Sequence, residues 1–287
     1  MKTLVALGST LCFVASLQAA TTIDPVNHFA YGANVGWIES RGDTNNGAVI
    51  GEYVCSGYLY SANVGWINLG NGSPVNHIQY QNNSGSDFGV NNDGLGNLRG
   101  YAYGANIGWI NFENTGAPKV DLKTGKLSGY IYSANAGWIS LSNAVAFVQT
   151  SFIANGADTD GDGLPDAWEY LHFGNLSATP NADPDGDGMT NLQEYLADTD
   201  PLNPNDNLKI TAFNSNPGGT IVNLTWTSKP TRSYSIQKRL DLNPVSIWSD
   251  SGLGVLLASG YSTSASFGDS SAPSRFYRVQ AQRPLAP

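Results

Sequence analysis

The sequence has little charge, two cysteines and three histidines. Only 13% of its 287 residues are Asp, Glu, Lys or Arg. Cys12 lies in the N-terminal segment discussed below, so Cys55 has no partner for an internal disulfide in the exported chain. We expect Cys55 to be a small buried side chain in a strand. His28 and His77 follow similar local sequences, but no cysteine pair accompanies them, which disfavours a metal site of the zinc type.

Catalytic signatures are missing as well. The sequence contains no HExxH, no GxSxG and no glycine-rich phosphate loop. Outside one acidic segment the carboxylates are sparse. Four of them lie near one another in the first repeat unit: Asp24, Glu39, Asp43 and Glu52. A glycosidase needs two acids that face each other across a cleft. We therefore expect no enzymatic activity, and a glycan-degrading enzyme remains only as a third hypothesis.

A long apolar run is also lacking. Lys2, the short apolar run 4–17 and the small residues Ala19 and Ala20 predict a secretory signal peptide over residues 1–20. The run is too short for a transmembrane helix, and no second one follows. We expect an exported protein, secreted or at the cell surface, with no transmembrane span in the mature chain.

The negative charge is concentrated in one part of the chain. The net charge is −9, and segment 151–206 holds twelve acids and no Lys or Arg. The rest of the chain is mildly basic without a basic cluster, which disfavours nucleic acid as a partner. Such an acidic segment is either disordered or neutralised by cations.

Four copies of one motif fill the region that we define as a β repeat domain, residues 21–148. The motif Tyr-[Gly/Ser]-Ala-Asn-x-Gly-Trp-Ile occurs at 31–38, 60–67, 103–110 and 132–139. Each copy predicts a hairpin, because alternating residues flank a loop that ends in Asn-x-Gly. One hairpin cannot bury its apolar face alone, so the copies must close or stack. The pattern leaves a barrel, a ring and a stack open.

The tryptophans of the motif have two interpretations. They can fill the core of the repeat while Asn34, Asn63, Asn106 and Asn135 serve as turn residues, which is the interpretation we favour. Alternatively, exposed aromatic rings beside amides suit carbohydrate binding. The residues in question are Trp37, Trp66, Trp109 and Trp138.

Two segments match the twelve-residue calcium loop. Residues 158–169 and 183–194 place oxygen ligands at positions 1, 3, 5, 7, 9 and 12, with Gly163 and Gly188 at the sharp turn. Position 7 contributes a backbone carbonyl, and the Glu at position 12 lies on the first turn of a short helix. The predicted ligands are Asp158, Asp160, Asp162, Leu164, Asp166 and Glu169, and Asp183, Asp185, Asp187, Met189, Asn191 and Glu194. Since Ca²⁺ takes six to eight hard oxygens, we expect about two Ca²⁺ ions and a segment, 149–207, that folds around them.

The remaining region, 208–287, contains short strand-like runs separated by Gly, Pro, Asn and Ser, which predicts a small β-sandwich. The predicted fold class is thus mainly β: an antiparallel repeat domain, a short calcium-binding loop-helix segment and a C-terminal β-sandwich.

Three resemblances support this division. The loops and the ending "EYLADTDPLNPND" (194–206) resemble the thrombospondin type 3 calcium repeats of bacterial surface proteins. In such repeats Asp residues are shared variably between loops, so Asp198 and Asp200 are further candidate ligands. The runs "NLTWTS" and "RFYRV" resemble fibronectin type III modules, and the "GYxYSxNxGWI" units resemble repeats of exported bacterial proteins.

These resemblances imply an exported, calcium-binding surface or matrix protein with a structural or adhesive role. Its expected partners are calcium and either extracellular glycans or other surface proteins. The alternative is a calcium-dependent carbohydrate-binding protein that uses the repeat tryptophans.

Overall fold

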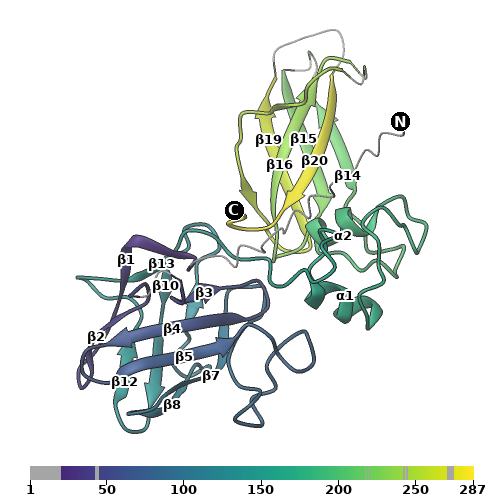
Figure 1. Ribbon diagram of the computed structural model, residues 1–287. Helices are drawn as coiled ribbons and strands as arrows, with labels where there is room; N and C mark the ends of the chain where they lie inside the picture. Colours follow the sequence, from purple (N-terminus) through teal and green to yellow (C-terminus); the bar gives the residue numbers. More distant parts are fainter. Residues whose placement is uncertain are drawn as a thin grey trace, which may run out of the picture.

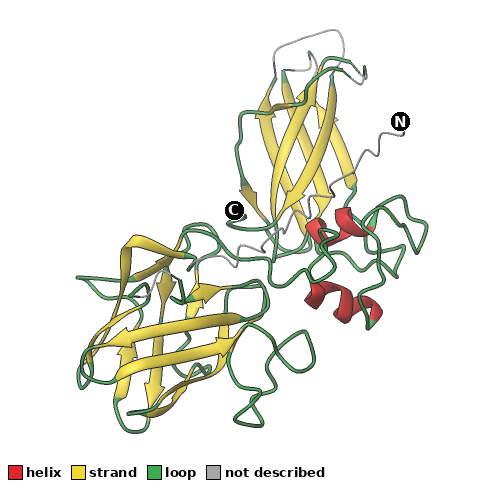
Figure 2. Ribbon diagram, viewed as in Figure 1, coloured by secondary structure: helices red, strands yellow, loops and turns green. Residues whose placement is uncertain are grey.

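The computed structural model describes residues 21–42, 45–216, 218, 220–241, 243, 245–269 and 275–287. The predicted signal peptide, 1–20, lies outside the described residues. The described chain is mainly β with antiparallel sheets and two short helices, which confirms the predicted fold class (Figure 2). None of the helices within these ranges combines the length and the hydropathy needed to cross a membrane.

The repeat region forms a closed sheet. Its eight strands are β1 (Ile23–Gly32), β2 (Gly36–Glu39), β4 (Cys55–Ser61), β5 (Gly65–Asn71), β7 (Leu98–Gly104), β8 (Gly108–Asn111), β11 (Tyr130–Ser133) and β12 (Gly137–Ser140). Each repeat is one hairpin, and consecutive hairpins pair side by side. The last strand returns to the first through Tyr31↔Ser140 and Gly32↔Ile139. Among the arrangements left open by the sequence, the structure therefore has a barrel (Figure 1).

Short strands lie outside these hairpins; three of them pair with barrel strands, and two form a separate two-stranded sheet. They are β3 (Val49–Ile50), β6 (Val90–Asn92), β9 (Lys119–Val120), β10 (Leu127–Ser128) and β13 (Val148–Thr150). Cys55, at the start of β4, is a free buried thiol, as expected.

The core of the barrel comes from the isoleucine of each motif and not from the tryptophan. Neighbouring residues of a strand point to opposite faces, so one residue of each Trp-Ile pair faces outward. Ile38, Ile67, Ile110 and Ile139 are 0% exposed, whereas the four tryptophans are 47–48% exposed. The expectation that tryptophan fills the core was wrong, because the hairpin register turns it to the outer face. The apolar interior leaves a cavity of only about 30 Å³.

The asparagine of each motif joins its hairpin to the next one. The Nδ2 groups of Asn34, Asn63, Asn106 and Asn135 donate to the carbonyls of Ala136, Val35, Val64 and Ile107, at 3.0–3.2 Å. These four bonds follow one another around the barrel end and close into a ring. The φ angles of the following glycines are 71–78°, which only glycine adopts without strain, so they let the loops turn. The Asn-x-Gly pattern therefore helps to close the barrel.

A segment with two helices leads to the C-terminal sheets. The helices are α1 (Asp166–Phe173) and α2 (Asn191–Ala197). One sheet contains β14 (Ile210–Ser215), β15 (Ile221–Thr227) and β19 (Ser262–Gly268), and the other β16 (Ser233–Arg239), β17 (Ser249–Asp250), β18 (Leu256–Leu257) and β20 (Phe276–Gln282). The two sheets share one core, which includes Trp226, Tyr234, Ile236 and Phe267. The helices lie at the base of these sheets, beside the barrel (Figure 1).

Candidate calcium-binding site

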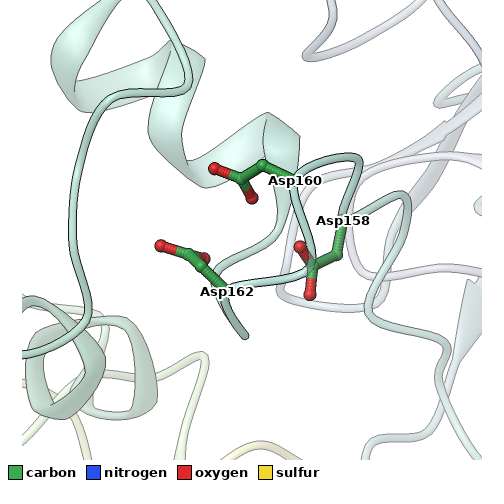
Figure 3. A group of neighbouring side chains, drawn as sticks. All are labelled: Asp158, Asp160 and Asp162. Carbon is green, nitrogen blue, oxygen red and sulfur yellow. The ribbon is translucent and has the colours of Figure 1, made fainter. Parts of the chain in front are cut away.

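The first acidic loop gathers three carboxylates around one space. Asp158, Asp160 and Asp162 each offer an oxygen, and these oxygens lie within 4.8 Å of one another (Figure 3). The loop holds this shape because the Asp158 carboxylate accepts hydrogen bonds from the backbone N–H groups of Gly161 (2.8 Å) and Gly163 (3.1 Å). Gly163 has a φ of 99°, so the sharp turn at position 6 requires glycine.

The second acidic loop repeats this geometry. Asp183, Asp185 and Asp187 again bring their oxygens within 4.8 Å. Asp183 accepts from the N–H groups of Gly186 (2.9 Å) and Gly188 (3.0 Å), and Gly188 has a φ of 97°. Two segments 25 residues apart thus fold into the same loop.

The helices bring the glutamates of position 12 beside the loops. Glu169 in α1 and Glu194 in α2 are 0% exposed. One oxygen of each is used: Glu169 Oε1 accepts from the N–H of Ala178 and Glu194 Oε1 from the Thr199 hydroxyl. The other oxygen of each, Oε2, is buried without a hydrogen-bond partner among the described residues. A buried carboxylate oxygen without a partner is costly, and a cation at this place would supply the missing partner.

The pKa values of the two glutamates also indicate uncompensated negative charge at each loop. Burial, together with the carboxylates of Asp160 and Asp162, raises the pKa of Glu169 to about 7. Burial and the carboxylates of Asp185 and Asp187 raise the pKa of Glu194 to about 8. Both glutamates therefore face an excess of negative charge, which a divalent cation would relieve.

The two loops differ at position 9. The Asp166 carboxylate accepts from the backbone N–H (2.7 Å) and the hydroxyl (2.5 Å) of Thr159, so it is used within the loop. In the second loop Asn191 Oδ1 is buried and has no partner in the described part of the chain. The second loop thus has four buried oxygens without a hydrogen-bond partner in the described part of the chain, on Asp185, Asp187, Asn191 and Glu194.

The residues at position 7 of each loop and the two candidate ligands after the second loop have different surroundings. Leu164 N donates to Asp162 at 2.8 Å and Met189 N donates to Asp187 at 2.7 Å, so both backbones lie against the acidic clusters. Asp198, by contrast, accepts from the Thr231 hydroxyl and lies 3.6 Å from Arg232. Asp200 faces His172 at 3.6 Å. Protein groups therefore already accompany these two acids.

The chemistry of this donor set suits calcium. Among the described residues, the clustered atoms of each loop are carboxylate oxygens, the hard ligands that Ca²⁺ takes, and no sulfur or imidazole belongs to either cluster. A family model described as the bacterial TSP3 repeat matches residues 158–174 and 183–204, which are these loops with their helices. A search of curated proteins and a search of solved structures both find no match. The chain thus contains thrombospondin type 3-like repeats whose aspartate clusters can hold a metal.

The other candidate groups have different surroundings. His28 lies 3.7 Å from Glu39, and His77 stacks on Tyr170 of α1 with ring centroids 4.1 Å apart. Asp24 caps its own turn by accepting from Val26 and Asn27. Asp43 lies outside the described residues.

Glu52 has a role that sequence reasoning missed. It is 9% exposed and lies 3.0 Å from Arg232 Nη2 and 2.8 Å from Arg283 Nε. The Tyr195 hydroxyl also donates to it, at 3.0 Å. Since Glu52, Arg232 and Arg283 are far apart in the sequence, their only signal there is that they are charged in a chain with little charge.

Proposed function

We propose that this is an exported, non-enzymatic calcium-binding protein of the cell surface or matrix, with a structural or adhesive role. In this proposal about two Ca²⁺ ions fold the segment 149–207. That segment then holds the barrel and the C-terminal sheets in one fixed arrangement. Its partners are calcium and extracellular glycans or surface proteins.

The buried cluster around Glu52 is the observation that carries this proposal. Glu52 belongs to the barrel, Tyr195 to α2, and Arg232 and Arg283 to the C-terminal region, and all four are buried. Arg283 also donates to the Ile153 carbonyl at 3.0 Å. Buried ion pairs hold their partners in one geometry, because separating them leaves an uncompensated charge in the interior.

Calcium acts on this cluster through α2. Glu194, at position 12 of the second loop, precedes Tyr195, and Arg232 donates to the carbonyls of Tyr195 (2.9 Å) and Leu196 (3.1 Å). An ion bound by Glu194 therefore fixes the helix that carries the contacts to both β regions. Because the helix has only seven residues, it depends on such external contacts for its stability.

A second candidate function is carbohydrate binding by the repeat tryptophans, favoured by their outward position. Each ring is about half exposed and lies against a tyrosine of the facing strand, with centroids 4.8–5.0 Å apart. Aromatic faces of this kind are suited to the apolar face of a sugar.

Limited proteolysis with a matched variant tests the main proposal. In calcium, segment 149–207 should resist cleavage, and small-angle scattering should give one compact particle. With chelator, cleavage should fall within that segment and the particle should expand. The variant Glu194→Gln should behave in calcium as the wild type does in chelator, whereas Glu113→Gln, an acid on the barrel, should not. Equal protection with and without calcium would refute the proposal.

A further inference from the structure

The four tryptophans of the barrel have equal exposure but unequal neighbourhoods. Trp138 of β12 lies beside a pocket of about 180 Å³ lined by Asn111, Glu113, Thr115, Gly116, Tyr132 and Trp138. The pocket lies where β8 meets β11, since Tyr132 pairs with Asn111 across that boundary. One wall is the loop 112–118 that follows β8, and the other is the Tyr132–Trp138 pair.

Backbone hydrogen bonds hold the loop 112–118, which forms one wall of the pocket, in place. Gly116 N donates to the Glu113 carbonyl at 3.2 Å, and Tyr130 N donates to the Gly116 carbonyl at 2.8 Å. A Cβ at position 116 would lie 1.9 Å from the Tyr130 carbonyl oxygen and 3.2 Å from the Trp138 ring, so only glycine fits. The loop therefore packs closely against the indole edge, and the pocket is formed before any ligand arrives.

The polar groups of the pocket are unused. Within the described ranges, the side chains of Asn111, Glu113 and Thr115 make no hydrogen bond, and Asn111 Oδ1 is buried without a partner. A pocket that combines an aromatic ring with a few unpaired amide, hydroxyl and carboxylate groups is suited to a ligand with one apolar face and several hydroxyl groups.

The other three boundaries between hairpins lack this combination. Asn68, the counterpart of Asn111, accepts from Gly70 N at 2.8 Å. The Ser140 hydroxyl donates to the Ser142 carbonyl at 2.7 Å, and Glu39 faces His28. Phe88 packs against Trp109 in an edge-to-face contact, with the ring centroids 5.0 Å apart and the planes at 84°.

We propose that the pocket at Trp138 binds one neutral pyranose unit of an extracellular polysaccharide. The sugar ring lies on the indole, and its hydroxyl groups bond to Asn111, Glu113 and Thr115. Acidic sugars are disfavoured, because Glu113 would face their charge. This inference rests on the adhesive role proposed above and gives it a ligand class.

A cationic ligand is the main competitor, since aromatic rings beside a carboxylate also suit an ammonium group. A cation, however, makes no use of the Asn111 amide or the Thr115 hydroxyl. A pyranose, by contrast, has hydroxyl groups that can form hydrogen bonds with all three polar side chains of the pocket.

The test uses calcium-loaded mature protein (residues 21–287) and three neutral probes: cellohexaose, chitohexaose and mannohexaose. Binding is followed by the indole N–H signals in a nitrogen-15 correlation spectrum, which are assigned with tryptophan variants. At least one probe should shift the Trp138 signal while the Trp66 signal stays in place. Trp138→Ala should weaken binding at least tenfold, which corresponds to about 1.4 kcal/mol. The control Trp248→Ala, at a tryptophan of the C-terminal region that lies beside Arg239, should leave affinity within about twofold.

Three results would overturn the inference: no shift with any probe at about 10 mM, equal losses in the two variants, or binding of oligolysine but of no sugar. Thr115→Val, which leaves both aromatic rings in place, should also weaken sugar binding and guards against misfolding of the tryptophan variant. The pocket contains no calcium ligand. Failure here with intact calcium binding would therefore overturn only this inference.

Discussion

Glu52→Gln removes the charge at the centre of the buried cluster and keeps its shape. In the wild type this carboxylate faces Arg232 at 3.0 Å, Arg283 at 2.8 Å and the Tyr195 hydroxyl at 3.0 Å. The two arginine side chains are 2% and 5% exposed, so water cannot replace the lost partner. Removing one partner of a buried ion pair costs about 3–5 kcal/mol, and the variant should lose about that much.

The assay is urea unfolding in saturating calcium, followed by tryptophan fluorescence. The matched control is Glu39→Gln, because Glu39 is a more exposed barrel glutamate, 3.7 Å from His28. The control should stay within about 0.5 kcal/mol of the wild type. If Glu52→Gln unfolds together with the control, the cluster does not hold the two β regions together, and this reasoning is refuted.

Three further predictions concern the loops, the barrel and the thiol. Because the metal-free fold raises the pKa of Glu194 to about 8, the chelated protein should become less stable as the pH rises from about 5 to 8, whereas its calcium affinity should rise. Thermal unfolding and calorimetric titration over that pH range measure the two trends. A stability or an affinity that does not change with pH would contradict the prediction. Asn106→Ala should cost about 1 kcal/mol in urea unfolding, since it leaves the Val64 carbonyl without its side-chain donor; no loss would mean that the asparagine ring does not stabilise the barrel. Burial raises the pKa of Cys55 to about 12, so a thiol reagent should label it only after unfolding, and fast labelling of the folded protein would contradict its position.

The two aspartate clusters could be predicted from the sequence, because a single short segment contains the whole pattern of each loop. Acids at positions 1, 3 and 5 and glycine at 6 fix the loop locally, and the structure forms the clusters there. Position 9 of the first loop was less predictable. Whether Asp166 faces an ion or Thr159 depends on how the chain enters the loop, which the pattern does not include.

The barrel shows where local patterns stop being informative. The motif predicted hairpins, but the outward position of Trp138 and the inward position of Ile139 depend on the register at which the hairpins meet. A one-residue change of register would exchange their faces. The Asn63 bond to Val35 and the pairing of Glu52 with Arg283 join distant parts of the chain, so no sequence window contains them.

Calorimetric titration of chelator-stripped mature protein with Ca²⁺ tests the central claim most directly. The account predicts about two sites in the wild type and one fewer in Glu194→Gln, with thermal unfolding shifted upward in proportion to the sites filled. No calcium binding by the wild type, or a Glu194→Gln variant that keeps every site, would contradict the claim that these loops are the metal sites that hold the protein together.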